Sequence, residues 1–196
     1  MQSLNLIKYE GEVYLYKGFL SSDESQFYFS TLSEYLDWQE EYIKIYGKQI
    51  KVPRLVCWYG DPGANYRYSG VTHEPLPWTQ ELVVLRNKIN ELTGHQFNSV
   101  LGNLYRGQND SMGWHADKEK ELGINPVIAS LSLGEARLFK LQHNKTKEIV
   151  DVILEPGSLL LMQGAIQHHW RHCVPKVKRA LAPRINLTFR KIIHLS

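Results

Sequence analysis

The chain has 196 residues, 43% of them hydrophobic, and a net charge of +3, which predicts one large domain with a sizeable core and excludes a disordered chain. Its two cysteines, Cys57 and Cys173, exclude a disulfide framework and favour a reducing compartment, the cytoplasm or, in a eukaryotic cell, the nucleus. No stretch approaches the roughly 18 apolar residues of a membrane helix, and Met1–Tyr9 lacks the pattern of a signal peptide, so we expect no membrane association.

The first half of the chain mixes helices and strands. Val13–Leu20 predicts a short strand, and Ser21 is a typical N-cap for a helix that ends near Leu36. A second helix begins at Pro77-Trp78 and ends at Gly94. Its apolar stripe consists of Leu82, Leu85, Ile89 and Leu92. Between the helices, two strand-like segments flank a tight turn and predict a hairpin, with the parts Tyr42–Tyr46, Gly47-Lys48 and Gln49–Pro53.

From Asn98 onward, short apolar segments recur between turns that contain Gly, Pro, Asn and charged residues. The predicted strands are Ser99–Tyr105, Val127–Leu133, Arg137–Leu141, Ile149–Leu154, Ser158–Met162, Gln167–Arg171 and Arg184–Ile192. This spacing is typical of a sandwich or barrel. We therefore predict an α+β protein whose residues 98–196 form a double-stranded β-helix (jelly roll) core. Residues 1–97 pack against that core in the same compact domain, with the helices outside and the hairpin as a lid.

A pair of metal-binding residues stands in the second half of the chain. His115 and Asp117 are two residues apart, so in an extended segment both side chains point the same way and reach one ion. The third ligand has three candidates: His168, His169 and His172. Two histidines and one carboxylate suit a non-haem Fe(II) oxygenase, and three ligands with an open position also suit catalytic zinc. Alone, the His115/Asp117 pair is more typical of a protein surface than of a metal site.

The segment from Arg184 to Arg190 alternates without a break. In a strand, one face carries three apolar side chains, and the other face carries Arg184, Asn186, Thr188 and Arg190. Arginine suits bidentate binding of carboxylates, so the two guanidinium groups are placed to bracket a small dianion. Asn103 and Tyr105 have the same spacing and offer neutral hydrogen bonds to that ligand. The alternative is an edge strand with a solvated, charged face.

Basic residues gather in the last quarter of the chain. They are Arg171, Lys176, Lys178, Arg179, Arg184, Arg190 and Lys191. A basic region beside a binding site suits an anionic partner such as a nucleic acid. Charge alone is equally consistent with an ordinary solvated surface.

These residues resemble the AlkB family of Fe(II)- and 2-oxoglutarate-dependent nucleic-acid demethylases. The matching motifs agree with the family in order and spacing, and they cover nearly the whole chain, from Tyr46 to Lys191. They are Asn103-Leu104-Tyr105, Trp114-His115-Ala116-Asp117-Lys118-Glu119, His172 and Arg184-Ile185-Asn186-Leu187-Thr188-Phe189-Arg190. Three further strings are most similar to members that act on duplex DNA: Val52-Pro53-Arg54, Tyr59-Gly60-Asp61 and Ala182-Pro183-Arg184.

The resemblance implies two cofactors, Fe(II) and the co-substrate 2-oxoglutarate. The implied iron ligands are His115, Asp117 and His172, with His169 as the fallback for the third. The implied co-substrate residues are Asn103, Tyr105, Arg184, Asn186 and Arg190. Among them, Arg184 would bind the distal carboxylate with help from Tyr105, and Arg190 would bind the carboxylate beside the keto group.

The resemblance also implies the activity and the substrate contacts. The enzyme would use O2 and 2-oxoglutarate to remove methyl groups from 1-methyladenine and 3-methylcytosine in DNA, releasing formaldehyde, succinate and CO2. A target base must leave the duplex to be reached. Tyr46, at the hairpin tip, would fill the resulting gap, although the family has an aromatic ring without a hydroxyl there. The other implied substrate contacts are Arg54, Tyr66, Tyr68 and Glu119, with Arg54 reaching the DNA backbone or the vacated partner base.

Three alternatives stand beside this prediction. The same chemistry could act on RNA, protein or a small molecule, but the Tyr46 tip and the basic last quarter favour nucleic acid. A non-catalytic nucleic-acid-binding jelly roll would need neither the metal set nor the arginines. A zinc hydrolase would not need arginines that bind a dicarboxylate. We expect the protein to be a monomer.

Overall fold

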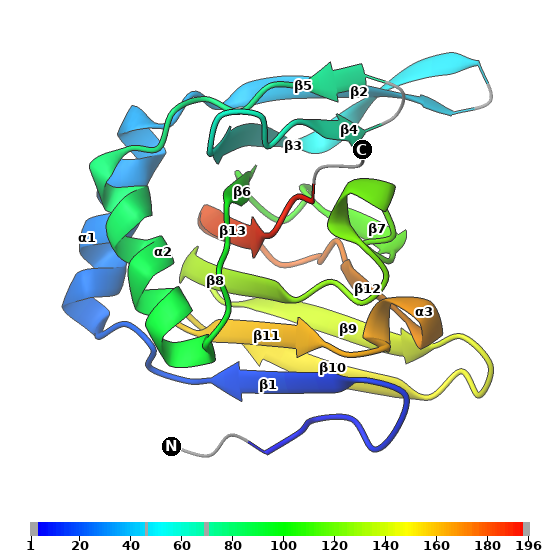
Figure 1. The fold of residues 1–196 in the computed structure, drawn as a ribbon. Coiled ribbons are helices and arrows are strands. Elements are labelled where there is room, and N and C mark those ends of the chain that lie inside the picture. Colours follow the sequence, from blue (N-terminus) through cyan, green and yellow to red (C-terminus); the bar gives the residue numbers. More distant parts are fainter. Residues whose placement is uncertain (1–3, 46, 69–70, 194–196) are drawn as a thin grey trace.

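The structure is a computed structural model that describes residues 4–45, 47–68 and 71–193 (Figure 1). In that part of the chain, two antiparallel sheets form the framework. The strands of the larger sheet are, in spatial order, β1 (Glu12–Tyr16), β11 (Leu159–Gln163), β8 (Ile128–Gly134), β13 (Arg184–Arg190), β6 (Ser99–Tyr105), β3 (Lys48–Gly60) and β2 (Gln39–Ile45). The strands of the smaller sheet are β10 (Ile149–Leu154), β9 (Arg137–His143), β12 (Trp170–Val174) and β7 (Met112–His115). This arrangement confirms the predicted jelly roll.

Two helices cover the outer face of the larger sheet, as predicted (Figure 1). Helix α1 (Ser22–Tyr35) begins at Ser21, whose hydroxyl accepts a hydrogen bond from the Glu24 backbone while the Glu24 carboxylate accepts one from the Ser21 backbone. Helix α2 (Gln80–Thr93) begins two residues later than expected and ends at Gly94, which adopts a left-handed φ of 72°. None of the described helices is long and apolar enough to cross a membrane.

The apolar side chains form two cores, one on each side of the larger sheet. Outside it, the helices pack on β13 through Leu32, Leu82, Leu85, Ile89, Ile185, Leu187 and Phe189. Between the two sheets lies a second cluster that includes Val13, Tyr105, Ile128, Phe139, Leu141 and Trp170. Leu92 was predicted to join the stripe of α2, but it is 44% exposed, in the last turn of the helix before Gly94.

Strand β13 lies at the centre of the larger sheet, between β8 and β6. All seven of its residues are buried, so the alternative of an edge strand with a solvated face is wrong. The apolar side chains reach the helix-covered core, and the polar ones face the space between the sheets. The alternation of polar and apolar residues from Arg184 to Arg190 therefore reflects two buried surroundings, the helix-covered core and the space between the sheets. It does not mark a boundary between core and solvent.

Two predicted strands differ at their ends. Val13–Leu20 ends as a strand at Tyr16, because the chain turns at Gly18, which has a φ of 65°. Gln167–Arg171 is not one strand: residues up to His169 form the short helix α3 (Ile166–His169), and β12 starts at Trp170. Alternation of polar and apolar residues cannot distinguish a single helical turn from the start of a strand.

The predicted hairpin forms from β2 and β3, which pair from Ile45 and Lys48 at the turn to Gln39 and Val56. Strand β3 is thirteen residues long, and its second half, Leu55–Gly60, pairs with β6, so the hairpin is an extension of the larger sheet. Residues 1–97 also supply β1, so this segment and residues 98–196 build one sheet together. The small sheet of β4 (Tyr66–Tyr68) and β5 (Val71–His73) lies beside the hairpin (Figure 1).

Candidate metal and co-substrate site

His115, Asp117 and His172 meet between the two sheets. His115 ends β7, and His172 is its direct cross-strand partner on β12. Asp117 follows two residues after β7 and lies 3.7 Å from His172, measured from Oδ2 to Nε2. The three candidate ligand atoms all lie within 4.8 Å of one another. A small movement of the side chains would bring them around one ion at ordinary ligand distances.

Neighbouring groups fix the orientation of these three side chains. Nδ1 of His115 donates to the carbonyl of Gly113 at 2.8 Å, which leaves Nε2 without its proton and available to a metal. The backbone N–H of Asp117 donates to Gln167 Oε1 at 2.9 Å, and the ring of Phe139 stacks on His172. Sequence reasoning missed the role of Gln167, because a buried glutamine in a short helix carries no signal of its own.

The electrostatics keep the site in its metal-binding protonation state. Burial alone would raise the pKa of Asp117, but Arg190, His172 and His115 together lower it to about 2. Burial and the adjacent His115 lower the pKa of His172 to about 3. At neutral pH the carboxylate is therefore ionised and the imidazole neutral, which are the forms that bind metal ions.

The other two candidate histidines lie outside this cluster. His168 contacts the carbonyl of Ile124 and the side chain of Asn125. His169 lies 3.5 Å from Glu10, measured from Nδ1 to Oε1. The structure therefore brings His172 to His115 and Asp117, as the resemblance implied, and leaves the fallback ligand His169 elsewhere.

Arg184 is a buried cation with unused hydrogen-bonding capacity. Its side chain is 1% exposed, and Nη2 donates to Ser132 Oγ at 2.9 Å. Nε and Nη1 have no hydrogen-bond partner among the described residues. Burial lowers the pKa of Arg184 to about 10, and the guanidinium lies 5.2 Å from the centre of the Tyr105 ring. A carboxylate of a bound dianion would supply the acceptors that these nitrogens lack.

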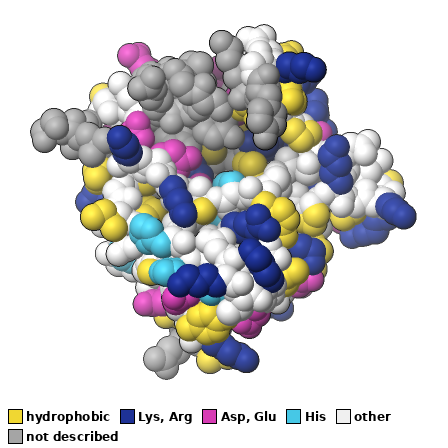
Figure 2. Space-filling view, turned by 90° about the vertical axis from the view of Figure 1, so that its right-hand side faces the viewer, with side chains coloured by type: hydrophobic (Ala, Val, Ile, Leu, Met, Phe, Trp, Pro, Cys, Tyr) yellow, Lys and Arg dark blue, Asp and Glu magenta, His cyan; other side chains and the backbone are white. Residues whose placement is uncertain are grey.

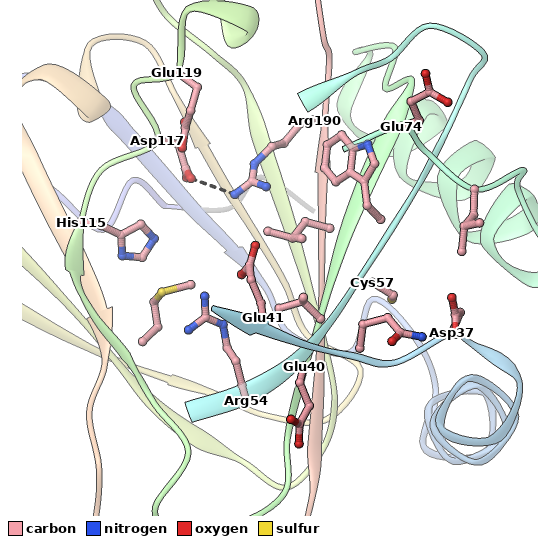
Figure 3. Close-up of a pocket in the computed structure, with 16 residues that line it drawn as sticks. Asp37, Glu40, Glu41, Arg54, Cys57, Glu74, His115, Asp117, Glu119 and Arg190 are labelled. Carbon is pink, nitrogen blue, oxygen red and sulfur yellow. Dashed lines mark hydrogen bonds and ion pairs between the residues drawn. The ribbon is translucent and has the colours of Figure 1, made fainter. Parts of the chain in front are cut away.

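Arg190 marks the opposite end of β13. Its Nη2 donates to Asp117 Oδ1 at 2.8 Å, so this guanidinium lies beside the metal ligands (Figure 3). A narrow cavity between the sheets is lined by Asn103, Tyr105, His115, His172, Asn186 and Arg190. The two arginines therefore stand at the metal end and the far end of the polar face of β13, as a dicarboxylate that reaches the metal would require.

Asn186, a neutral residue of this cavity, already forms hydrogen bonds with other side chains of the protein. Asn186 donates to Ser130 Oγ at 2.7 Å and accepts from Thr188 at 3.1 Å. Sequence reasoning missed Ser130 and Ser132, which hold Asn186 and Arg184 from the neighbouring strand β8. Their spacing within a predicted strand was the available signal, because it places both hydroxyls on one face.

Arg54 was expected to reach the DNA backbone or a vacated base, and the structure places its side chain inside the protein, so that role stays a prediction. The side chain is 4% exposed, and Nε donates to Asn103 Oδ1 at 2.7 Å. A second contact joins Nη1 to the carbonyl of Ser111. Strand β3 continues into the sheet rather than ending at the hairpin, so the arginine points inward toward the site.

A larger cavity of about 240 Å³ opens beside the metal ligands (Figure 3). His115, Asp117 and Arg190 lie on its wall, and Arg54 and Met112 line it as well. Among its described lining residues are six carboxylates, Asp37, Glu40, Glu41, Glu74, Asp117 and Glu119. Only two arginines, Arg54 and Arg190, line it with them, so the cavity favours a neutral or positively charged guest.

The structure describes the side chains of only some of the predicted substrate contacts. Glu119 lines the larger cavity, as its assignment requires. Tyr46 lies outside the described residues. Tyr66 and Tyr68 begin and end β4, but their side chains also lie outside the described part of the structure. The roles of the three tyrosines stay predictions.

Comparison with known proteins agrees with this geometry. The model of the 2OG-Fe(II) oxygenase superfamily matches residues 12–190. The alpha-ketoglutarate-dependent dioxygenase alkB homolog 3 of Bos taurus is 41% identical over 190 residues, covering 92% of this chain and 66% of that protein. The DNA oxidative demethylase ALKBH2 of Mus musculus is 43% identical over 159 residues, covering 77% of this chain and 66% of that protein. The solved structure of OsALKBH1 has a TM-score of 0.69 at 17% identity, covering 94% of this chain and 99% of that one.

The chain therefore belongs to the 2OG-Fe(II) oxygenase superfamily, and it is similar to proteins that are named as AlkB homologues. It spans 66% of the length of the bovine and mouse relatives, slightly less than two thirds. The likeness to OsALKBH1 shows the fold. Fe(II) and 2-oxoglutarate are the cofactors that define this superfamily, and the His115/Asp117/His172 cluster offers the matching ligand set.

Proposed function

We propose that this protein is an oxidative demethylase that repairs 1-methyladenine and 3-methylcytosine in DNA. The observation that carries the proposal is the opening of an acidic cavity onto His115 and Asp117 of the metal-binding cluster. Both methylated bases carry a positive charge, and the five lining carboxylates other than the metal ligand Asp117 favour a cation by simple electrostatics. Iron and 2-oxoglutarate, when bound, supply the oxidation by O2 that converts the methyl group to formaldehyde and the co-substrate to succinate and CO2.

The residues of the chain have distinct roles in this proposal. His115, Asp117 and His172 hold the iron and leave its remaining positions open. Arg184 and Arg190 bind the two ends of the co-substrate, with Asn103, Tyr105 and Asn186 beside them. Because Arg184, Arg190, Asp117 and His172 are buried, whereas His115 is half-buried at the cavity, the co-substrate would be fixed in a largely enclosed site.

The target base enters the larger cavity from the solvent side. Glu119 contacts the exocyclic amino group, Tyr68 stacks on the flipped base and Tyr66 makes a polar contact. Tyr46 fills the gap in the duplex, where an inserted ring offsets part of the unstacking cost. Arg54 lines the same cavity, where its hydrogen bond to Asn103 holds the guanidinium.

The substrate is DNA rather than a free nucleoside in this proposal. Figure 2 shows Lys and Arg side chains around a hollow in the face that carries the right-hand end of the sheets. Among the basic residues of the last quarter, Lys176, Lys178 and Arg179 are exposed after β12, whereas Arg184 and Arg190 are buried in the site. The mouse relative is named as a DNA oxidative demethylase. The protein would act as a monomer wherever the cell keeps its DNA.

The test is to incubate the protein with Fe(II), 2-oxoglutarate and ascorbate and a duplex that carries one 1-methyladenine, and to follow the base by mass spectrometry. Loss of one methyl group that requires 2-oxoglutarate, and is absent in His115→Ala and Asp117→Ala, is the expected result. Turnover of 2-oxoglutarate without any change in methylated DNA or RNA oligonucleotides would overturn the substrate assignment. No turnover by iron-loaded protein would overturn the activity itself.

A further inference from the structure

A second cluster of metal-binding side chains lies away from the cavity. Glu10, His143 and His169 have their candidate ligand atoms within 4.8 Å of one another. Oε2 of Glu10 lies 2.6 Å from His143 Nε2, and Oε1 lies 3.5 Å from His169 Nδ1. Glu10 stands just before β1, His143 ends β9 and His169 ends α3. Figure 1 shows these three segments side by side at the end of the sheets where β1 begins.

The ring of His143 is packed firmly with Nε2 aimed at Glu10. Its side chain is only 3% exposed, and its ring lies 5.1 Å from the ring of Tyr9 and 5.0 Å from that of Trp170. Nδ1 lies 2.9 Å from the hydroxyl of Thr146 and accepts the backbone N–H of Thr146 at 3.1 Å, so without a metal Nε2 donates to Glu10. When Nε2 binds a metal, the proton moves to Nδ1, and a shift of the Thr146 backbone lets the hydroxyl accept it.

The backbone at Glu10 is bent to aim its carboxylate at the two histidines. Glu10 has a φ of 54°, in the left-handed region that residues other than glycine seldom adopt. The next residue, Gly11, passes so close to α3 that a Cβ there would lie 2.7 Å from Ile166. The turn is therefore packed tightly against the helix that carries His169, which fixes the distance between the carboxylate and that imidazole.

We propose that Glu10, His143 and His169 bind a divalent transition-metal ion, with Zn²⁺ as the ion expected. Two imidazole nitrogens and one carboxylate oxygen form an ordinary zinc ligand set, and a water molecule completes the tetrahedron. The side chains of Glu10 and His169 are 36% and 33% exposed, so solvent reaches the fourth position. In the metal-free state the same groups hydrogen-bond directly. Metal binding fastens the turn before β1 to β9 and α3, three segments that are distant in sequence.

The test separates this site from the iron site by removing each in turn. Metal-free Asp117→Ala protein is titrated with Zn²⁺ in a calorimeter, and the expected result is one ion per chain with a rise in the thermal unfolding midpoint. Adding His169→Ala or Glu10→Gln to that background is expected to weaken Zn²⁺ binding at least tenfold. His168→Ala, the adjacent histidine that contacts Ile124, is the matched control and is expected to leave the affinity unchanged.

Metal analysis of the protein with an intact iron site is the second measurement. After saturation with Zn²⁺ and removal of free ion, we expect two ions per chain in the parent protein and one in His169→Ala. One ion per chain in both proteins would overturn the proposal, as would equal affinities of the Asp117→Ala protein with and without His169→Ala. These outcomes do not depend on whether the protein demethylates DNA.

Discussion

Arg184 is the residue whose environment most clearly requires a ligand. It is buried, its charge is retained, and two of its nitrogens have no acceptor among the described residues. Arg184→Lys keeps the charge but loses the planar fork that binds a carboxylate through two hydrogen bonds. We expect the KM for 2-oxoglutarate to rise roughly 10- to 100-fold, from about 1.5–3 kcal/mol for one lost charged hydrogen bond.

Succinate formation at varied 2-oxoglutarate concentration measures this effect. Arg179→Lys, the same substitution at a side chain that is 73% exposed, is the control and is expected to leave the KM unchanged. An unchanged KM in Arg184→Lys would place the distal carboxylate of the co-substrate elsewhere.

The pair of Arg54 and Asn103 distinguishes an internal role of the arginine from a contact with DNA. In the structure, Arg54 donates to the buried Asn103, so Arg54→Met leaves the amide oxygen without its charged donor. We expect a loss of about 1–3 kcal/mol in the free energy of unfolding, and less than the sum of the single effects when Asn103→Ala is added. Urea unfolding of the two single variants and the double variant measures this coupling. Additive losses, together with weaker duplex binding, would instead support the contact with DNA.

Among the elements, the neighbouring strands β6 and β3 leave no room for a side chain at Gly102. Gly102 in this strand faces Cys57 of β3, and a Cβ at Gly102 would lie 2.4 Å from its sulfur and 3.0 Å from the ring of Trp38. The thiol is buried, which raises the pKa of Cys57 above its usual range. Gly102→Ala therefore forces the two strands apart, and we expect a loss of about 1–3 kcal/mol in the free energy of unfolding.

Gly113→Ala is the matched control for this substitution, since a Cβ at Gly113 meets no atom within 4 Å. Chemical denaturation of both variants measures the difference. Because β3 also carries Arg54 to the cavity, we expect Gly102→Ala to lower the proposed demethylase activity as well. Equal stability of the two variants would show that the strands can separate without cost.

At the scale of the whole molecule, the larger cavity and the surface after β12 differ in the sign of their charge. Carboxylates line the cavity, whereas Lys176, Lys178 and Arg179 are exposed on the outer surface. A nucleic acid would release counterions on binding to those cations, and each phosphate contact contributes about 0.9 to the slope of log affinity against log salt. Replacing the three residues by Ala should flatten this slope by about 2.7 for a methylated duplex.

Fluorescence anisotropy at several salt concentrations measures the slope. Lys17→Ala combined with Lys88→Ala serves as the control, because Lys88 lies on α2, outside the larger sheet, and pairs with Glu24. We expect the control to keep the parent slope. Affinity for 2-oxoglutarate should not change in either protein, since its arginines are buried. An unchanged slope in the triple variant would place the DNA on another face.

The local features of this protein could be predicted from sequence because they depend on backbone geometry alone. The alternation from Arg184 to Arg190 has the period of a strand, and Ser21 and Gly94 are typical helix ends, so these elements formed where expected. The spacing of His115 and Asp117 indicated that both bind one metal ion, but it did not identify the third ligand. Where one turn of helix replaced a strand, at Gln167–His169, the segment was too short for its period to be diagnostic.

The tertiary structure decided what depends on contacts between distant parts of the chain. The pairing of β12 with β7 places His172, rather than His168 or His169, opposite His115. Because β3 extends into the larger sheet, the side chain of Arg54 points inward and binds Asn103, which is 49 positions away in the sequence. The sequence by itself therefore determined the strands, the helix ends and the chemical types that the site would use. The sheet register decided which of these side chains meet, because residues far apart in sequence come together only through strand pairing and packing.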